Sequence, residues 1–284
     1  MIRVGIVGYG TIGKRLADAI RAQPDMSVAG VAKRSPDHAA MLANRRGYPF
    51  YAADGIERFA DTDVDVEGDV SDLVYTSDVV VDTTPSGVGE QNRRLYERQE
   101  TPALFQGGES ADVAETSFVA NANYEDAIGA DSVRVVSCNT TGLTRLLAPL
   151  DRRFGVDGAQ VTLVRRGADP GDSDRGPIDD IMPDPVAIPS HHAPDLGTVL
   201  PDVDVTTMAM KVPATVMHVH AIRIQLESEA SAEAVTDVMA GEPRVTMIPG
   251  SASIDGCAGL RELGRDVGRS RGDLWENCIW EHSV

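Results

Sequence analysis

The stretch Val4-Gly5-Ile6-Val7-Gly8-Tyr9-Gly10-Thr11-Ile12-Gly13 decides the fold of the first half of this 284-residue chain. The apolar run 2–7 reads as a strand, and residues 14–23 read as a helix with one apolar face. A Gly-x-Gly-x-x-Gly turn between a strand and a helix is the fingerprint of a dinucleotide-binding unit. Its glycines admit a pyrophosphate, and the first N–H groups of the helix face the phosphates. We therefore predict that a dinucleotide is bound by Gly8, Gly10, Thr11, Ile12 and Gly13.

Strand-like and helix-like segments continue to alternate after this turn. We expect strands at 28–32, 78–82, 103–106 and 132–136, and helices at 14–23, 38–46 and 90–99. The acidic segment 61–72 reads as an exposed strand or loop. Such βα alternation implies a parallel sheet with right-handed crossovers. The predicted fold class is α/β, with a Rossmann-type dinucleotide-binding domain at residues 1–137.

The choice of nicotinamide cofactor depends on the residues about 20 positions after the glycine turn. An Asp or Glu there would hold the ribose 2′-OH of NAD, but this chain has Lys33 and Arg34. Two cations suit the 2′-phosphate of NADP, so we predict NADP as the preferred cofactor and NAD as usable. The alternative is that both are solvated loop residues. Thr84, Pro85 and Gly87 follow another expected strand, at the sheet edge where ligands bind, and are predicted to line the nicotinamide side.

The second half of the chain has a different pattern. Residues 156–165 and 215–227 alternate with a period of two, which is typical of antiparallel strands. Between them lies a long Pro-, Asp- and Gly-rich stretch, 167–201, and irregular segments of that length are usually functional. We predict a catalytic α+β domain at residues 138–284 with a mainly antiparallel sheet.

Cys138 lies where the expected strand 132–136 gives way to an expected helix at 143–150. Free backbone N–H groups and the positive end of a helix dipole stabilise a thiolate there, and the thiolate is the nucleophile. A buried structural cysteine is the alternative. The three cysteines have no metal-ligand spacing, so no metal site is expected.

The composition is strongly acidic, with 44 Asp and Glu against 26 Lys and Arg and a formal net charge of −18. Such a surface repels nucleic acid and anionic membranes, so we expect neither as a partner. Scarcity of lysine favours a protein of a salt-loving organism over an ordinary acidic protein, because high ionic strength screens self-repulsion. The sequence contains neither a long apolar run nor a signal peptide, and we expect a cytoplasmic protein.

Several motifs together resemble the archaeal type II glyceraldehyde-3-phosphate dehydrogenases. They are the glycine turn 4–13, Asp82-Thr83-Thr84-Pro85-Ser86-Gly87, Ser137-Cys138-Asn139-Thr140-Thr141-Gly142-Leu143, His191-His192-Ala193-Pro194-Asp195 and Val212-Pro213-Ala214-Thr215-Val216-Met217-His218-Val219-His220. The resemblance implies a homotetramer with Cys138 as nucleophile and the cofactor bound in part by Gly108 and Arg166. It implies substrate contacts from Ser137, Asn139, His191 and His192, to which the residues themselves add Thr140 and Arg165 as donors. Members of this family continue with a further strand and a C-terminal helix, which are expected to be absent here because the sequence ends at Val284.

The predicted reaction is oxidation of glyceraldehyde 3-phosphate to 1,3-bisphosphoglycerate, with inorganic phosphate resolving a Cys138 thioester. A histidine of the Met-His-x-His strand is the expected base. His218 and His220 share one face of that strand, and His218 is preferred. Three alternatives remain open at this stage. They are a non-phosphorylating aldehyde dehydrogenase, a semialdehyde dehydrogenase with the same cysteine and histidine chemistry, and a catalytically silent nucleotide sensor.

Overall fold

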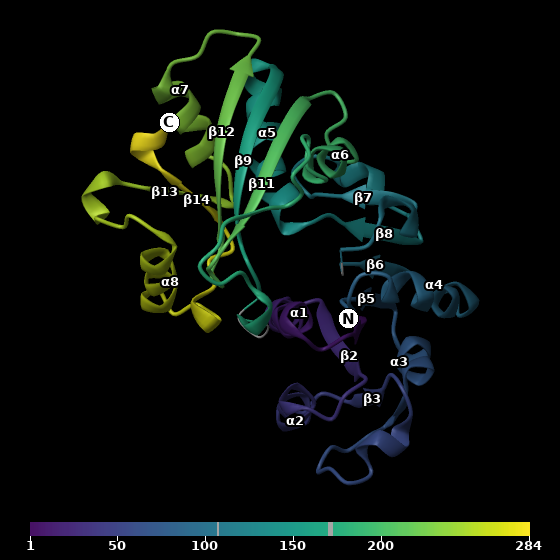
Figure 1. Ribbon diagram of the computed structural model, residues 1–284. Helices are drawn as coiled ribbons and strands as arrows, with labels where there is room; N and C mark the ends of the chain where they lie inside the picture. The colour runs from purple at the N-terminus through teal and green to yellow at the C-terminus, as the bar shows by residue number, and fades with distance from the viewer. Residues whose placement is uncertain (107, 170–172) are drawn as a thin grey trace. The chain divides into compact units, whose positions relative to one another are not determined.

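A computed structural model describes residues 1–106, 108–169 and 173–284. The chain forms two compact units (Figure 1). Unit 1 comprises residues 1–118 and 124–136, and unit 2 comprises residues 119–123 and 137–284. Within the described residues, no helix has the length and hydropathy required to cross a membrane.

Unit 1 contains one eight-stranded sheet in which every pair of neighbouring strands is parallel. Its order is β4-β3-β2-β1-β5-β6-β8-β7. The strands are β1 (Ile2–Val7), β2 (Met26–Lys33), β3 (Phe50–Ala52), β4 (Gly68–Asp69), β5 (Val79–Asp82), β6 (Ala103–Phe105), β7 (Thr116–Phe118) and β8 (Ser132–Val135). The helices are α1 (Thr11–Arg21), α2 (His38–Arg45), α3 (Val70–Thr76) and α4 (Val88–Arg98).

Two apolar cores form on opposite faces of this sheet, because successive strand residues point to opposite sides. Ile6 of β1 and Phe50 of β3 belong to one core, together with residues of α1 and α2. Their neighbours Val7 and Tyr51 belong to the other core, with residues of α3 and α4. This doubly covered parallel sheet is the predicted Rossmann-type fold.

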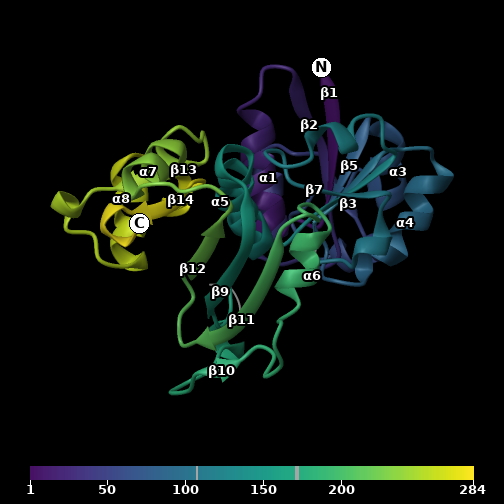
Figure 2. The same ribbon diagram turned by 90° about the horizontal axis from the view of Figure 1, so that it is seen from above.

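Unit 2 contains a four-stranded sheet of order β10-β11-β9-β12 and a separate pair, β13-β14. Its strands are β9 (Val156–Arg166), β10 (Met182–Pro183), β11 (Asp204–Val212), β12 (His218–Leu226), β13 (Val245–Ile248) and β14 (Asn277–Trp280). Its helices are α5 (Cys138–Phe154), α6 (His192–Gly197), α7 (Ala232–Ala240) and α8 (Cys257–Asp266). Figure 2 shows α7, α8, β13 and β14 gathered on one side of this sheet, next to β12.

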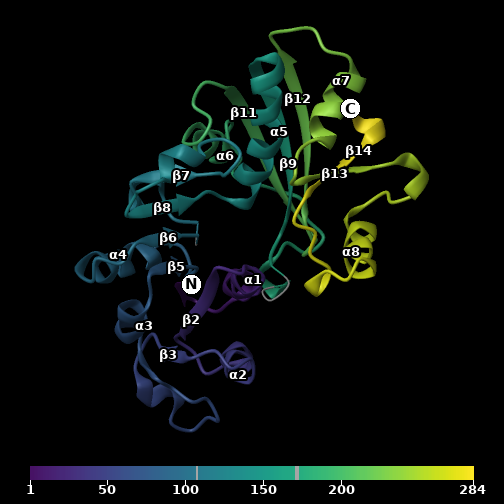
Figure 3. The same ribbon diagram turned by 180° about the vertical axis from the view of Figure 1, so that it is seen from behind.

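The long helix α5 covers one face of the β9, β11 and β12 strands, lying behind them in Figure 1 and in front of them in Figure 3. Strand pairing sorts the side chains of this face into rows across the sheet. One row is Thr207, Val161 and Ile222, the next is Ala209, Leu163 and His220, and the last is Lys211, Arg165 and His218. The face therefore changes along the strands from apolar to basic, and its basic end is the end with the histidines.

The predicted fold class is confirmed, with several local differences, the first being the additional strands β3 and β7. β9 and β12 are antiparallel as expected, but β11 runs parallel to β9, so the sheet is mixed. The long crossover needed for a parallel pair is the stretch 167–201, which contains α6 and β10 as well as residues 170–172, outside the described part. The helix expected at 143–150 begins at Cys138, and α3 begins inside the segment expected to be strand or loop.

Candidate active site

The glycine turn of unit 1 has the geometry that a pyrophosphate requires. Gly8 has φ of +93°, and a Cβ there would lie 2.9 Å from the Thr83 backbone. A Cβ on Gly13 would lie 2.1 Å from the Gly8 carbonyl oxygen, whereas a Cβ on Gly10 would meet nothing within 4 Å. Helix α1 begins at Thr11 without a side-chain cap, so its first N–H groups remain available to an anion. These residues fit a dinucleotide cofactor.

The loop after β5 lies against this turn, because β1 and β5 are neighbours in the sheet. Thr83 N–H donates to the Val7 carbonyl at 2.8 Å. The backbone N–H of Thr84 donates to Asp82 at 2.9 Å, and the N–H of Gly87 donates to Glu109 at 2.9 Å. Two buried carboxylates therefore fix the loop that contains Thr84, Pro85 and Gly87.

The two basic residues expected at the ribose lie at the end of β2. Lys33 forms an ion pair with Asp37 at 3.0 Å, and Arg34 is exposed. Asp37 also accepts hydrogen bonds from the first turn of α2. Lys33 therefore already has an acidic partner, whereas Arg34 is exposed to solvent.

In unit 2, Cys138 is the first residue of α5 and is exposed. Ser137 is the N-cap, and its hydroxyl oxygen accepts from the Thr140 N–H at 3.1 Å. Asn139 is the second residue of α5, so its N–H is one of the first helix N–H groups, which have no acceptor within the helix. The thiol therefore lies at the positive end of a helix dipole, next to a free N–H donor.

His218 is the side chain that meets this thiol. Its Nε2 lies 3.5 Å from Cys138 Sγ, and the backbone N–H of Arg166 donates to its Nδ1 at 3.1 Å. Since Nδ1 accepts a hydrogen bond, the proton of the neutral ring is assigned to Nε2, which faces the sulfur. Burial, then the positive charges of Arg166 and Arg165, lowers the pKa of His218 to about 3. His218 is thus an uncharged hydrogen-bond donor to the sulfur.

His220 contacts Asn139 instead of the cysteine. Its Nε2 lies 3.0 Å from Asn139 Oδ1, and Asn139 Nδ2 lies 3.2 Å from His192 Nε2. Burial lowers the pKa of His220 to about 4, and burial with the charge of His191 does the same for His192. The side chains of His192 and Asn139 are each 1% exposed. Both side chains therefore bind other protein groups in the interior of unit 2. Both ring nitrogens of His192 are hydrogen-bonded to protein atoms.

The other expected substrate residues surround the same helix start. The exposed His191 stacks on His192 with ring centroids 4.0 Å apart. The hydroxyl of Thr140 donates to Asp195 of α6, and the Ser137 N–H approaches the same carboxylate at 3.4 Å. Helix α6 therefore holds the start of α5 through Asp195 as well as through His192.

A basic pair lies in the same sheet row as His218. Arg165 forms an ion pair with Asp184, and Lys211 lies 3.3 Å from the same carboxylate. The Nε atom of Arg165 is buried without a hydrogen-bond partner. Arg166 forms an ion pair with Asp169. The single carboxylate of Asp184 thus faces two cations, Arg165 and Lys211. This leaves a local excess of positive charge in a strongly acidic protein.

The structure brings together most of the site residues expected in unit 2, and it adds residues that the motifs did not reveal. Those added are Asp184, Ser190, Thr207 and Lys211, and Asp195 of the His191-to-Asp195 motif gains a structural role. Thr207 and Lys211 lie on the face of β11 that α5 covers. Polar residues at positions that face the interior were the feature of the sequence that could have indicated them. Gly108, which the resemblance assigns to the cofactor, has φ of +79°, and Gly107 before it lies outside the described residues.

Two family models match the chain. Residues 137–256 match the C-terminal domain of glyceraldehyde 3-phosphate dehydrogenase, and residues 2–105 match the N-terminus of dihydrodipicolinate reductase. The second match covers the parallel sheet of unit 1 from β1 to β6.

Solved structures of semialdehyde dehydrogenases share the fold. Aspartate semialdehyde dehydrogenase from Candida albicans has a TM-score of 0.67 at 15% identity, over 95% of this chain and 87% of that one. Aspartate semialdehyde dehydrogenase II from Vibrio cholerae has a TM-score of 0.64 at 12% identity, over 88% and 82%. At such identities the likeness concerns the fold alone.

Curated relatives are much more similar in sequence. A glyceraldehyde-3-phosphate dehydrogenase of Haloarcula marismortui is 62% identical over 284 residues, which are 100% of this chain and 80% of the relative. One of Halobacterium salinarum is 57% identical over 286 residues, covering 100% and 85%. One of Methanopyrus kandleri is 51% identical, covering 100% and 83%. With this identity along its whole length, and with the cysteine and histidine arrangement described above, the chain belongs to the glyceraldehyde-3-phosphate dehydrogenase family.

Proposed function

We propose that the protein oxidises D-glyceraldehyde 3-phosphate to 1,3-bisphosphoglycerate, with inorganic phosphate and a nicotinamide cofactor. The observation that carries this proposal is the 3.5 Å approach of His218 Nε2 to Cys138 Sγ, with His218 Nδ1 held by the Arg166 N–H. Such a cysteine and histidine pair stabilises the thiolate of Cys138. The Nε2 proton of His218 is then directed at the reacting atoms.

The reaction begins with attack of the Cys138 thiolate on the aldehyde carbon. A C–S bond forms, and the carbonyl oxygen becomes an alkoxide, which accepts hydrogen bonds from His218 Nε2–H and the Asn139 N–H. A nicotinamide cofactor, when bound, would supply the acceptor for the hydride of this carbon, and loss of that hydride would leave a thioester on Cys138. Inorganic phosphate then displaces the Cys138 sulfur. In this scheme His218 acts as a donor to the oxyanion, instead of as the base expected from the sequence.

We propose that the phosphate of the substrate binds at the basic end of the unit 2 sheet. Arg165, Lys211 and the exposed His191 supply the donors, while Asp184 holds the two cations in place between turnovers. Anion binding needs local donors here because the net charge of −18 repels anions at long range. His192 contributes indirectly, since both of its ring nitrogens already bind protein groups.

For the cofactor, we propose unit 1 as the binding unit, with domain limits at residues 1–137 and 138–284. Gly8, Gly10, Thr11, Ile12 and Gly13 would hold the pyrophosphate, and the loop 84–87 with Gly108 and Arg166 would hold the nicotinamide side. Preference for NADP with use of NAD is supported by the accessible Arg34 and by the absence of an acidic residue at positions 33 and 34. We also propose a cytoplasmic protein adapted to high salt, as the sources of its halophilic relatives support.

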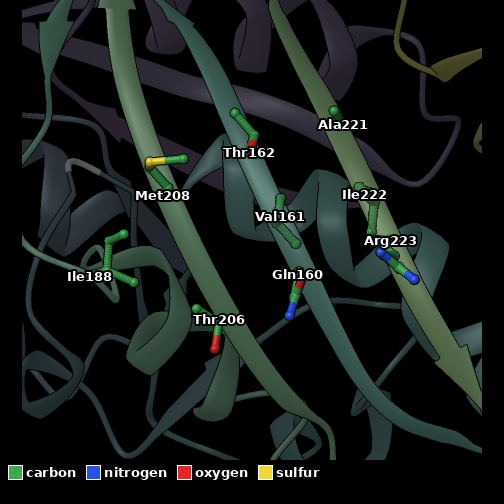
Figure 4. A pocket seen from close by; sticks show the side chains of 9 residues that line it. All are labelled: Gln160, Val161, Thr162, Ile188, Thr206, Met208, Ala221, Ile222 and Arg223. Atoms are coloured by element: carbon green, nitrogen blue, oxygen red, sulfur yellow. The ribbon is translucent and has the colours of Figure 1, made fainter.

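We propose a homotetramer, in which the open face of the unit 2 sheet packs on a second copy. This face, opposite α5, is lined by Met208, Thr162 and Ala221, with Ile188 beside them (Figure 4). Met208 is 43% exposed and Ile188 60% exposed. Arg223 on the β12 edge and Asp204 on the β11 edge point to this same face. A twofold axis along the strands would bring these opposite charges together, as isologous interfaces require.

The test of the activity is reduction of NADP and of NAD with glyceraldehyde 3-phosphate in molar KCl, with and without inorganic phosphate. Phosphate-dependent turnover that favours NADP is expected. Turnover that ignores phosphate would instead show a non-phosphorylating dehydrogenase. A folded, cofactor-binding protein without turnover would show a nucleotide sensor. Light scattering of wild type and Met208→Lys in the same buffer tests the tetramer, which the lysine should split.

A further inference from the structure

Five side chains beside the nucleophile form one continuous hydrogen-bond chain. It runs through Thr207, Ser190, His192, Asn139 and His220. The distances are 2.7 Å from Thr207 Oγ1 to Ser190 Oγ, 3.0 Å from Ser190 Oγ to His192 Nδ1, 3.2 Å from His192 Nε2 to Asn139 Nδ2, and 3.0 Å from Asn139 Oδ1 to His220 Nε2. Four members are nearly inaccessible, with Ser190 and Thr207 0% exposed.

The direction of this hydrogen-bond chain is fixed at one end by a backbone group. The Thr207 hydroxyl donates to the Ser190 carbonyl oxygen at 3.2 Å, and a carbonyl can only accept. The Ser190 hydroxyl must then donate to Thr207, so its oxygen accepts from His192 Nδ1–H. His192 Nε2 is consequently an acceptor, which turns the amide nitrogen of Asn139 toward it. The amide oxygen of Asn139 is left to accept from His220 Nε2–H.

This arrangement connects the first turn of α5 to α6, β12 and β11 of unit 2. Asn139 follows Cys138 directly and is tied to α6 through His192 and to β12 through His220. His220 and His218 are two residues apart on the same strand face, so the same strand presents His218 to the thiol. The position of Cys138 relative to His218 therefore depends on how Asn139 is held.

We propose that Ser190 and Thr207 are positioning residues for the nucleophile: they fix the direction of the hydrogen bonds through His192 to Asn139 and thereby keep Cys138 Sγ against His218 Nε2–H. The catalytic consequence rests on the proposed function. Without the Thr207 hydroxyl, the Ser190 hydroxyl is free to donate to His192 Nδ1, which reverses every later bond and flips the Asn139 amide. Both directions of the hydrogen-bond chain are then populated, and the first turn of α5 is no longer held in a single position.

The decisive variants are Thr207→Val, which removes the hydroxyl at nearly constant shape, and Thr207→Ser, which keeps it. The first readout is the rate of Cys138 alkylation by iodoacetamide from pH 6 to pH 10, followed on the Cys138 peptide by mass spectrometry. The others are kcat and KM for glyceraldehyde 3-phosphate, and Tm.

We expect Thr207→Val to slow alkylation and shift its pH profile upward, and to lower kcat about ten- to a hundredfold. The KM should stay within about twofold, because the basic row that would bind the phosphate is outside the hydrogen-bond chain. Thr207→Ser should behave as wild type in all of these measurements.

A Thr207→Val protein that is as reactive as Thr207→Ser at every pH would overturn the proposal, even if its Tm were lower. Ser190→Ala removes the same link from the other side and decides the matter if Thr207→Val does not fold. Alkylation requires no turnover, so this assay remains informative if the proposed dehydrogenase activity is not found.

Discussion

The helices α1 and α5 each follow a parallel strand of the same sheet, but only the first turn of α5 is capped and bound by side chains. The first turn of α1 has no side-chain cap, and its N-cap residue, Gly10, borders open space. The first turn of α5 is capped by Ser137, bound by Asp195 and tied to His192 and His220 through Asn139. Both turns offer the positive end of a helix dipole, but only one holds a side chain in place.

The difference shows what each helix start has to do. A turn that binds a charged ligand through backbone N–H groups functions better without side chains around it, because any side chain would occupy the space of the ligand. A turn that carries a nucleophile must fix one sulfur atom relative to one imidazole, and small displacements there cost rate steeply. The predictions below probe this contrast from its largest expected effect to its smallest.

Replacement of the nucleophile should have the largest effect. Cys138→Ser is expected to lower kcat at least about 10³-fold, because a hydroxyl at that position is a far weaker nucleophile than a thiolate. Cys257 offers a matched control, since it is also the first residue of a helix, α8, but burial raises the pKa of its thiol. Cys257→Ser should retain activity. Equal losses in the two variants would contradict the assignment of the nucleophile.

In the glycine turn at the start of α1, two variants should separate an effect on folding from an effect on cofactor binding. Gly13→Ala places a Cβ 2.1 Å from the Gly8 carbonyl oxygen, so we expect the free energy of unfolding to fall by about 1–3 kcal/mol and the Tm to be clearly lower. Gly10→Ala has room in the protein and should keep its Tm while losing about tenfold or more in cofactor affinity, measured by calorimetry. A Gly10→Ala protein that binds the cofactor normally would exclude this turn as the pyrophosphate site.

Acid should loosen the start of α5 before the start of α1. The pKa values of His192 and His220 are about 4 in the folded protein, below their ordinary value of 6.5. Between these values the unfolded chain binds more protons, so stability falls as the pH falls from about 6.5 toward 4, by at most about 1.4 kcal/mol per pH unit for each histidine. Hydrogen exchange, corrected for intrinsic rates, should show less protection at residues 140–144 at pH 5 than at pH 7. Residues 12–16 should change less, and an equal response would refute the contrast.

The smallest effect is expected at the cofactor ribose. Lys33→Ala combined with Arg34→Ala should lower the NADP to NAD ratio of kcat/KM about three- to tenfold, since each lost charge-assisted contact is partly replaced by solvent. Lys14→Ala, which changes another lysine of unit 1, serves as the charge control. An unchanged ratio in the double variant would remove the basis for the NADP preference.

The fold of unit 1 could be predicted from the sequence because its signals are local: a glycine turn, apolar strands and helical periodicity. The early start of α5 was missed because Asn139, Thr140, Thr141 and Gly142 are weak helix formers. Their helix is held by Ser137 and by partners from distant segments. Tertiary contacts thus override local preference at this turn.

For the site, motifs placed Cys138 and His218 but could not place Thr207 or Lys211. Both of these depend on the register of β11 against β9, a parallel pairing across a long crossover. No local pattern specifies such a register. For the same reason, the protein partners of His192, Ser190 and Asn139, become evident only when the strands are paired, and its contact with substrate stays a prediction.

The crossover between β9 and β11 also sets an order of assembly. It contains Ser190, His192 and Asp195, the groups that hold the start of α5, and its Asp184 and Ser190 N–H groups donate to β11, which pairs with β9. Pairings between strands far apart in sequence form slowly, because the intervening chain must be ordered first. Cys138 therefore gains its fixed neighbours near the end of folding. A nascent or partly folded chain carries a cysteine without the machinery around it, so chemical reactivity at this position reports completed folding of unit 2.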